Sequence, residues 1–267
     1  MAEETFYFTH GNMKCIVFNE KNRQSPADQM YATVPEDERE AVMTEFGLDG
    51  NVPSAINVLL IDTGDEKILI DTGLGQGALY TGLATEGIVY DEIDQIIVTH
   101  GHGDHIGGIL DNDGGLVFPN AHYWINETEW GQWDESGDSY SELQQKVKDT
   151  LPAEKVHLIR DEGEFMAGFS PMFIPGHCKG MMGVIVESAG KKMIHIADVM
   201  HHPLQVKYPD WCVNFDRDKP KARETRRKVW ERAADEQMLV FSYHVWRGGQ
   251  GRITRQGSTF EWEWITS

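Results

Sequence analysis

The sequence has few cysteines, and their positions exclude two common kinds of site. The three cysteines are Cys15, Cys178 and Cys212, which lie far apart and form no Cys-x-x-Cys pair. An odd number of widely spaced thiols argues against a disulfide framework and against a zinc site built from thiolates. The pattern favours a reducing compartment, and we expect a cytoplasmic protein.

Basic residues and long apolar runs are also scarce. The chain has 24 Lys and Arg against 43 Asp and Glu, a formal net charge of −19. Because phosphate backbones and anionic lipids bind clustered Lys and Arg, this acidity argues against a nucleic-acid or membrane-surface partner. No window approaches the roughly 18 consecutive apolar residues of a membrane span. The first residues, MAEETFYFTHGNMK, lack the basic and apolar regions of a secretory signal, so no membrane partner is expected.

The remaining composition is that of a globular protein. Of its 267 residues, 40% are hydrophobic and 25% are charged. Apolar runs at 54–64 and 66–73 predict two strands joined by a hairpin turn at Gly64-Asp65-Glu66. Further strands are expected before His100, His177, Asp198 and His244, and helices at 34–50, 127–150 and 219–237. Strands followed by helices in two similar halves, with no flexible linker between them, predict one α/β domain with helices outside a pair of sheets.

The histidines are concentrated at one place. Residues 99–108 read THGHGDHIGG, so His100, His102, Asp104 and His105 follow directly after an apolar strand. Imidazole and carboxylate are ligands that Zn²⁺ prefers, and the intervening glycines let the backbone turn so that several side chains converge. A polar turn with satisfied imidazoles explains a lone histidine but not this spacing, which predicts a metal site.

Three later residues have the same placement, at or just past the end of a strand. They are His177, Asp198 and His244. Loops that leave strands at one edge of a sheet are where α/β folds build their sites. The sequence therefore offers enough strand-end ligands for a second metal beside the first.

These motifs resemble those of the metallo-β-lactamase superfamily. THGHGDH is similar to its HxHxDH signature, and His177 in PGHCKG, Asp198 and His244 match its later ligands. Within the superfamily the likeness is greatest to the N-acyl homoserine lactonase and methyl parathion hydrolase-like branch. The resemblance implies a four-layer αββα sandwich formed by residues 1–267, with an N-terminal extension of about residues 1–52 ahead of the core. The branch also suggests a homodimer.

The resemblance further implies roles for the matching residues. One zinc ion would bind His100, His102 and His177, and the other Asp104, His105 and His244. Asp198 would bridge both ions together with a hydroxide, which attacks a small-molecule substrate. Asp104 would carry a proton to the leaving oxygen, and Asp71 would orient a ligand histidine. Manganese, iron or cobalt suit similar donors.

Some positions depart from the family pattern or remain open. Cys178-Lys179-Gly180 follow His177 where Thr-Pro-Gly is usual, and Ala197 precedes the bridging aspartate where glycine is common. His201 stands where many lactonases have tyrosine, and is either a substrate-binding or an ordinary loop histidine. Trp246 follows His244 closely and is the best aromatic candidate for the substrate pocket. GLGQGA at 73–78 matches a dinucleotide-binding pattern only loosely.

The function expected from this reading is a dinuclear zinc hydrolase that opens a small lactone or ester, with some turnover of phosphotriesters. Alternatives within hydrolases are a thioesterase of the glyoxalase II type and a β-lactamase. Alternatives of another class are a di-iron redox protein and a non-catalytic metal-binding protein of the same fold. His102 stands where the di-iron proteins usually have glutamate, and all seven ligands are present, so the sequence favours a hydrolase.

Overall fold

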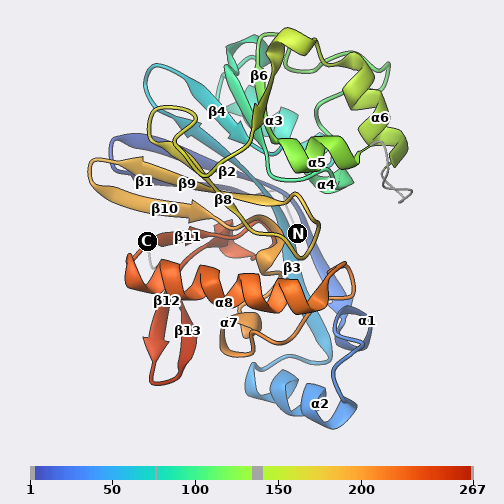
Figure 1. Ribbon diagram of the computed structural model, residues 1–267, viewed down its shortest axis with the longest axis vertical. Coiled ribbons are helices and arrows are strands. Elements are labelled where there is room, and N and C mark those ends of the chain that lie inside the picture. Colours follow the sequence, from blue (N-terminus) through green and yellow to red (C-terminus); the bar gives the residue numbers. More distant parts are fainter. Residues whose placement is uncertain (1–3, 76, 134–140, 266–267) are drawn as a thin grey trace.

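Two β-sheets pack face to face between outer layers of helices in the computed structural model (Figure 1), which describes residues 4–75, 77–133 and 141–265. The first sheet has seven strands and the second has six. The predicted four-layer α/β architecture is confirmed. None of the helices in the described ranges is long and apolar enough to cross a membrane.

The first sheet follows the chain order β1 to β7. Its strands are β1 (Thr5–His10), β2 (Met13–Pro26), β3 (Asn51–Asp62), β4 (Lys67–Ile70), β5 (Gln95–Val98), β6 (His122–Asn126) and β7 (Val156–Ile159). Strands β1 to β4 pair in antiparallel fashion, whereas β4 to β7 are parallel. The carboxyl ends of β4, β5 and β6 therefore lie along one edge, where the histidine-rich segment begins.

The second sheet has the order β13-β12-β11-β10-β9-β8. Its strands are β8 (Phe169–Phe173), β9 (Met182–Ser188), β10 (Lys191–His195), β11 (Leu239–Phe241), β12 (Gln250–Gln256) and β13 (Thr259–Trp264). Only β10 and β11 pair in parallel within it. Their ends lead to Asp198 and His244, so two predicted ligands leave the sheet side by side.

Helices cover the outer face of each sheet. The first sheet carries α3 (Ala78–Thr85), α4 (Gly103–Ile106), α5 (Glu127–Gln132) and α6 (Ser141–Thr150), and the second carries α8 (Lys219–Asp235). Short 3-10 turns occur at Tyr90–Glu92, Ala153–Lys155, Ala197–Val199 and Arg247–Gly249. The helix predicted at 127–150 is α5 and α6, and residues 134–140 lie outside the described ranges.

Alternating apolar residues form the layer between the sheets. Leu59 and Ile61 of β3 point to this layer with Val184 of β9 and Phe241 of β11, and each of them is fully buried. Val58 and Leu60 point to the opposite face, against α3 and α6. Side chains that alternate between two buried faces explain why β3 is apolar almost throughout.

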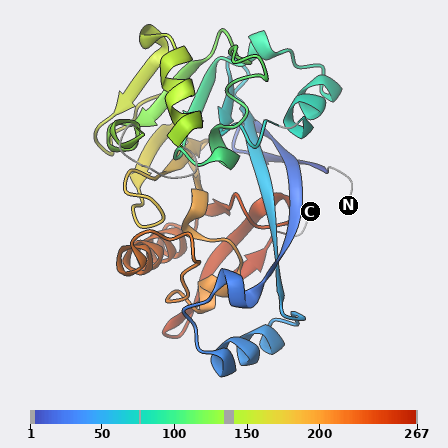
Figure 2. The ribbon, with the colours of Figure 1, turned by 90° about the vertical axis from the view of Figure 1, so that its right-hand side faces the viewer.

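A long ribbon of β2 and β3 extends past the rest of the first sheet toward α1 (Ala27–Met30) and α2 (Glu36–Glu45), as Figure 2 shows. Both helices pack on the segment around α7 (Leu204–Lys207), where Tyr31 contacts Trp211. Of residues 1–52, the segment 5–26 belongs to the first sheet, and α1 and α2 lie beyond it. This packing places Arg23, Ser25 and Met30 at the site described next.

Candidate metal centre

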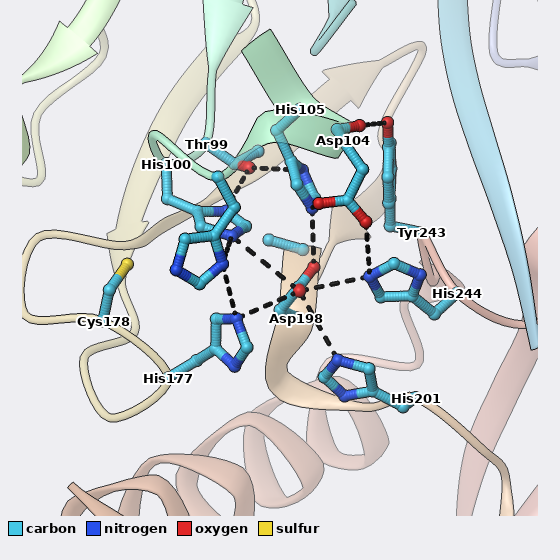
Figure 3. A network of polar contacts seen from close by, with 12 residues as sticks. Thr99, His100, Asp104, His105, His177, Cys178, Asp198, His201, Tyr243 and His244 are labelled. Carbon is cyan, nitrogen blue, oxygen red and sulfur yellow. Dashed lines mark hydrogen bonds and ion pairs between the residues drawn. The ribbon is translucent and has the colours of Figure 1, made fainter. Parts of the chain in front are cut away.

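The predicted ligand residues converge at the edge where β5, β8, β10 and β11 end (Figure 3). His100 and His102 follow β5, and Asp104 and His105 lie on α4. His177, Asp198 and His244 follow β8, β10 and β11 respectively. Each segment leaves its strand at the same edge, and therefore residues distant in the chain meet there. The structure brings all seven together.

Asp198 lies at the centre of this group. Its Oδ1 is 3.1 Å from Nε2 of His105, and its Oδ2 is 3.1 Å from Nε2 of His244 and 3.2 Å from Nε2 of His177. Nε2 of His100 is more distant, at 3.8 Å. Asp198 is 3% exposed, and its carboxylate is therefore almost fully surrounded by imidazole rings.

Three groups of donor atoms that could hold a metal ion lie around this carboxylate. His100, His102, His177 and Asp198 form one group that could hold a metal ion, and Asp104, His105 and His244 form another. In the first group, Nδ1 of His102 lies 3.1 Å from Nε2 of His100 and 3.0 Å from Nε2 of His177. In the second, Asp104 lies 3.9 Å from Nε2 of both His105 and His244. Asp198, His201 and His244 form the third group. The first two groups contain the ligand sets that the family resemblance implies.

The outer nitrogen of each well-anchored imidazole donates a hydrogen bond away from the centre. Nδ1 of His105 donates to Asp71 at 2.7 Å, and Nδ1 of His244 donates to the Ala55 carbonyl at 2.8 Å. Nδ1 of His177 donates to Asp216 at 3.1 Å. In its neutral form each of these rings carries its one N–H on Nδ1, so its Nε2 keeps a lone pair toward the centre, as metal ligation requires.

The donor set fits divalent metal ions. Nε2 of His105 and Oδ1 of Asp198 are buried atoms without a hydrogen-bond partner, although they lie 3.1 Å apart. Nε2 of His100, Nδ1 of His102 and Nε2 of His177 also converge. At most one of these three nitrogens can carry an N–H that points at the others, so at least two of them face each other with lone pairs. Buried polar atoms are normally satisfied, and cations placed between these donors would satisfy them.

Burial and charge set the protonation of the ligands. Burial and the neighbouring His177 lower the pKa of His102 to about 3, so this ring is neutral near pH 7. Burial also lowers the pKa of His100 well below its usual range. Burial opposes protonation of His105 as well, but Asp198 and Asp71 outweigh it and hold its pKa well above the usual value. Burial likewise opposes protonation of His244, but Asp198 outweighs it and raises the pKa of this ring, so His105 and His244 are the rings that favour a proton beside the carboxylates without cations.

A cavity of about 340 Å³ opens onto the centre. It is lined by His102, Asp104, His177, Asp198, His201 and His244 on the ligand side, and by Arg23, Ser25, Met30, Ser54, Phe215 and Arg217 elsewhere. His201 stacks on His244 with ring centroids 4.7 Å apart, and its Nε2 lies 3.5 Å from Asp198. His201 therefore lines the cavity. The sequence alone does not distinguish this position from that of an ordinary loop histidine.

The structure places Trp246 in a different cavity. Its indole stacks on His202 at 4.9 Å and contacts Trp264 at 5.2 Å, in a pocket of about 360 Å³ that His244 does not line. The two residues that follow it, Arg247 and Gly248, have positive φ. The expectation that Trp246 borders the substrate beside His244 is not met.

Two residues beside the proposed ligands, Ala197 and Asp71, have positive φ. Ala197 has φ of +44°, in the left-handed region where the common glycine of the family is unstrained. Asp71 has φ of +61°, and in this conformation its carboxylate accepts hydrogen bonds from both the amide and the hydroxyl of Thr99. Backbone strain of this kind tends to cluster at functional sites.

Sequence reasoning missed residues that hold the ligands in place. The Gly101 amide donates to Glu129 at 2.9 Å, and Gln144 donates to the Gly101 carbonyl at 2.8 Å, so a clamp of two buried side chains fixes the peptide between His100 and His102. Asp216 accepts from His177 and from the buried Arg226. No local pattern in the sequence marks Glu129, Gln144 or Asp216, because all three come from distant segments.

Cys178 and the 73–78 loop, both considered in the sequence analysis, make contacts other than metal or cofactor binding. Cys178 points away from the ligands (Figure 3), and its thiol donates to Glu129 at 3.5 Å. In the 73–78 loop, the carboxylate of Glu20 accepts hydrogen bonds from the amides of Leu74 and Leu79. An acidic side chain thus occupies the amides that a dinucleotide phosphate would need, which argues against the dinucleotide reading.

Comparison with known proteins agrees with this geometry. Residues 51–240 match the metallo-beta-lactamase superfamily. A probable metallo-hydrolase of Mycobacterium tuberculosis is 23% identical over 236 residues, which cover 70% of this chain and 74% of that protein. AidC, a dizinc quorum-quenching lactonase solved with a product, has a TM-score of 0.88 at 23% identity over 99% of both chains. The hydrolase AbOPH has a TM-score of 0.90 at 21% identity over 100% of this chain and 99% of its own.

Proposed function

The chain belongs to the metallo-beta-lactamase superfamily and is a metal-dependent hydrolase, and from this premise we propose that it opens small lactones or esters at a centre of two zinc ions. The proposed ligands are His100, His102 and His177 for one ion, Asp104, His105 and His244 for the other, and Asp198 for both.

The observation that carries the proposal is the sharing of one carboxylate by two donor groups. Asp198 approaches His177 of the first group and His105 and His244 of the second within 3.2 Å. A carboxylate has two oxygens, so it can serve two cations at once. Such a pair of sites favours hydrolysis over a purely structural metal site, which is usually closed by four ligands around one ion.

The donors suit zinc, and manganese, iron or cobalt suit them too. When bound, two such cations lower the pKa of a shared water toward neutrality and polarise the oxygen of the bond to be cleaved. Asp71, Asp216 and the Ala55 carbonyl keep the lone pairs of His105, His177 and His244 directed at them.

Asp104 is placed to handle the proton of the reaction. In lactone hydrolysis the water oxygen bonds to the carbonyl carbon, the ring C–O bond breaks, and a proton must reach the leaving oxygen. Burial raises the pKa of Asp104, but His105 and His244 outweigh it, so that its pKa lies below the usual value. We assign Asp104, which lines the cavity, as the carboxylate that takes this proton and delivers it.

His201 offers a hydrogen bond to the substrate. It lines the cavity between His244 and Phe215 and is 5% exposed. Its Nδ1 is a buried nitrogen with no hydrogen-bond partner among the described residues. A substrate oxygen beside the ring would give such a nitrogen a partner, and this is the role that we propose for His201.

A panel of substrates tests the proposal. The zinc-loaded protein is assayed on N-acyl homoserine lactones, simple γ- and δ-lactones, aryl esters, paraoxon-type phosphotriesters, a thioester and a cephalosporin, with Asp198→Ala as the background control. We expect lactones and esters to have the highest kcat/KM, with slower phosphotriester turnover. Turnover confined to the thioester or the cephalosporin, or equal for both proteins, would contradict it.

A further inference from the structure

The cavity above the metal centre contains two guanidinium groups that the hydrolytic chemistry does not use. Arg23 and Arg217 both line the cavity that holds Asp104, Asp198 and His244. Cationic side chains are outnumbered by acids in this chain, since Lys and Arg together number 24 against 43 Asp and Glu. Two arginines therefore line one cavity of an acidic protein.

Arg23 is fixed relative to the second group of ligands. It lies on β2 opposite Ser54 of β3. The next residue of β3, Ala55, makes two hydrogen bonds of 2.8 Å with His244, one from its amide to the His244 carbonyl and one from the imidazole to its carbonyl. Arg23 forms no ion pair with any of the described residues. Its side chain therefore extends from a rigid ribbon without an acidic partner.

Arg217 is fixed relative to the first group of ligands. Its amide donates to the His177 carbonyl at 3.2 Å. The preceding residue, Asp216, accepts the His177 imidazole N–H at 3.1 Å and pairs with the buried Arg226. The two arginines thus enter the cavity from two segments, each anchored to a histidine of a different ligand group.

The charge of the cavity follows from its lining. Asp104 and Asp198 are its only acidic lining residues among the described ones, and both are proposed metal ligands. Two divalent cations would exceed their charge, and Arg23, which pairs with none of the described acids, adds to the excess. The cavity would then be strongly positive in a chain whose formal net charge is −19.

We propose that this cavity selects a lactone or ester that carries a carboxylate on its non-reacting part, and that Arg23 and Arg217 bind this carboxylate. The proposal rests on the lactone or ester hydrolysis proposed above. A planar guanidinium pairs with a carboxylate through two parallel hydrogen bonds, which the metal ions do not provide in the same geometry. Met30 and Phe215 line the same cavity and would contact the carbon skeleton of the substrate.

A matched pair of substrates tests the proposal. A γ-lactone that bears a carboxylate is compared with the same lactone bearing a carboxamide, which has nearly the same shape but no charge. For the zinc-loaded wild type we expect kcat/KM to be at least about tenfold higher for the carboxylate, and this ratio to fall as salt is added. In the double variant Arg23→Gln/Arg217→Gln we expect the ratio to approach one.

The control is Arg232→Gln. Arg232 is a partly exposed residue of α8 that pairs with Glu236 and does not line the cavity. Its substitution removes a positive charge at a distance from the cavity, and we expect it to preserve both the activity and the ratio. A ratio that falls equally in this variant would mean that net charge, rather than the two cavity arginines, determines the preference, and would overturn the proposal.

A binding measurement keeps the two proposals separable. Calorimetry with tetrahydrofuran-2-carboxylate and its carboxamide, which the protein cannot hydrolyse, should show the same preference in the zinc-loaded wild type and its loss in the double variant. Equal binding of the two ligands, or a preference that survives in the double variant because the metals hold the carboxylate, overturns the role of the arginines. Failure to hydrolyse any lactone or ester contradicts the proposed function, and the binding result still decides the arginine proposal.

Discussion

The buried Asp71 carboxylate is linked to His105 directly and to His100 through Thr99. Its Oδ2 accepts the N–H of His105 at 2.7 Å and the hydroxyl of Thr99 at 2.7 Å, and Thr99 Oγ1 in turn lies 3.1 Å from Nδ1 of His100. His100 and His105 belong to different ligand groups. One acidic side chain therefore orients a proposed ligand of each metal ion.

Asp71→Asn is expected to weaken both metal sites. Asp71 accepts hydrogen bonds from the amide and hydroxyl of Thr99 and from Nδ1 of His105. An asparagine NH₂ group in place of one carboxylate oxygen would face one of these donors, and the tautomer with the proton on Nδ1 of His105 would lose its support. Loss of such an orienting group typically lowers metal affinity by about 10- to 100-fold. Competition with a chromophoric chelator measures this affinity, and Asp65→Asn, on an exposed turn, is the control. An unchanged affinity in Asp71→Asn would show that His105 needs no such partner.

Asp216→Ala is expected to lower stability strongly. The carboxylate pairs with Arg226 at 3.4 Å, and both side chains are 1% exposed. Removal of one partner leaves a buried charge uncompensated, which costs about 3–5 kcal/mol in the free energy of unfolding. Urea unfolding of the metal-free protein measures it.

Asp210→Ala is the matched control for Asp216→Ala, because Asp210 pairs with Arg227 at the surface. Exposed pairs contribute about 0–1 kcal/mol, so this variant should unfold nearly as the wild type does. Equal losses in the free energy of unfolding in the two variants would mean that the buried pair contributes no more to stability than the exposed one.

Gly101→Ala is expected to disturb the turn between His100 and His102. A Cβ at this position would lie 2.2 Å from Nε1 of Trp133 and 2.9 Å from Nε2 of Gln144. Neither side chain can move away without losing a hydrogen bond, since Trp133 donates to Glu129 and Gln144 donates to the Gly101 carbonyl. We expect a protein that folds but retains less metal at the first site after dialysis. Metal analysis after dialysis checks this.

Gly131→Ala is the control for the turn substitution. Gly131 lies within α5, and a Cβ at this position would meet no atom within 4 Å outside its own helix. Alanine is favoured over glycine in a helix by roughly 1 kcal/mol, so metal content should be unchanged and stability slightly higher. Full metal retention by Gly101→Ala would rule out the clamp as a determinant of the site.

Acid is expected to destabilise the protein partly through His195. This ring has no exposed surface, and burial lowers its pKa to about 3. Between that value and the unfolded pKa of about 6.5, the unfolded chain binds a proton that the folded chain does not. The free energy of unfolding therefore decreases as the pH is lowered through this range. His195 should account for about 2 kcal/mol of the loss between pH 7 and pH 5.

His195→Gln removes this proton linkage. Urea unfolding at pH 7 and pH 5 should show a smaller loss of stability on acidification in the variant than in the wild type, whatever its stability at pH 7. An identical loss in both proteins would mean that His195 takes up its proton in the folded state.

The sequence predicts those parts of the fold that local patterns encode. Continuous apolar runs such as 54–61 predict buried strands, and the acids after Pro35 predict the start of α2. The hairpin of β12 and β13 is not among the predicted strands, although Trp262 and Trp264 alternate with Glu261 and Glu263 as in a strand with one covered face. Local patterns do not predict the second half of β2, since it is polar and is defined by pairing with β3 rather than by burial.

The same distinction applies to the site. His100, His102, Asp104 and His105 were identifiable because they are close together in the chain, and His177, Asp198 and His244 because each follows a strand. Glu129, Gln144, Asp216 and the two cavity arginines act through contacts that only the tertiary structure creates. Proximity in sequence does not predict the position of Trp246, since it lies two residues after His244 but lines a different cavity. The homodimer and the cytoplasmic location stay predictions.

The metal content of the purified protein tests the central claim most directly. The metal-free chain is titrated with zinc while bound metal and lactone hydrolysis are measured on the same samples, with Asp198→Ala alongside. The account predicts about two zinc ions per wild-type chain, activity that rises until both are bound, and a folded Asp198→Ala protein that has lost most hydrolysis. Saturation at one ion or none, or near-wild-type turnover by Asp198→Ala, would contradict it.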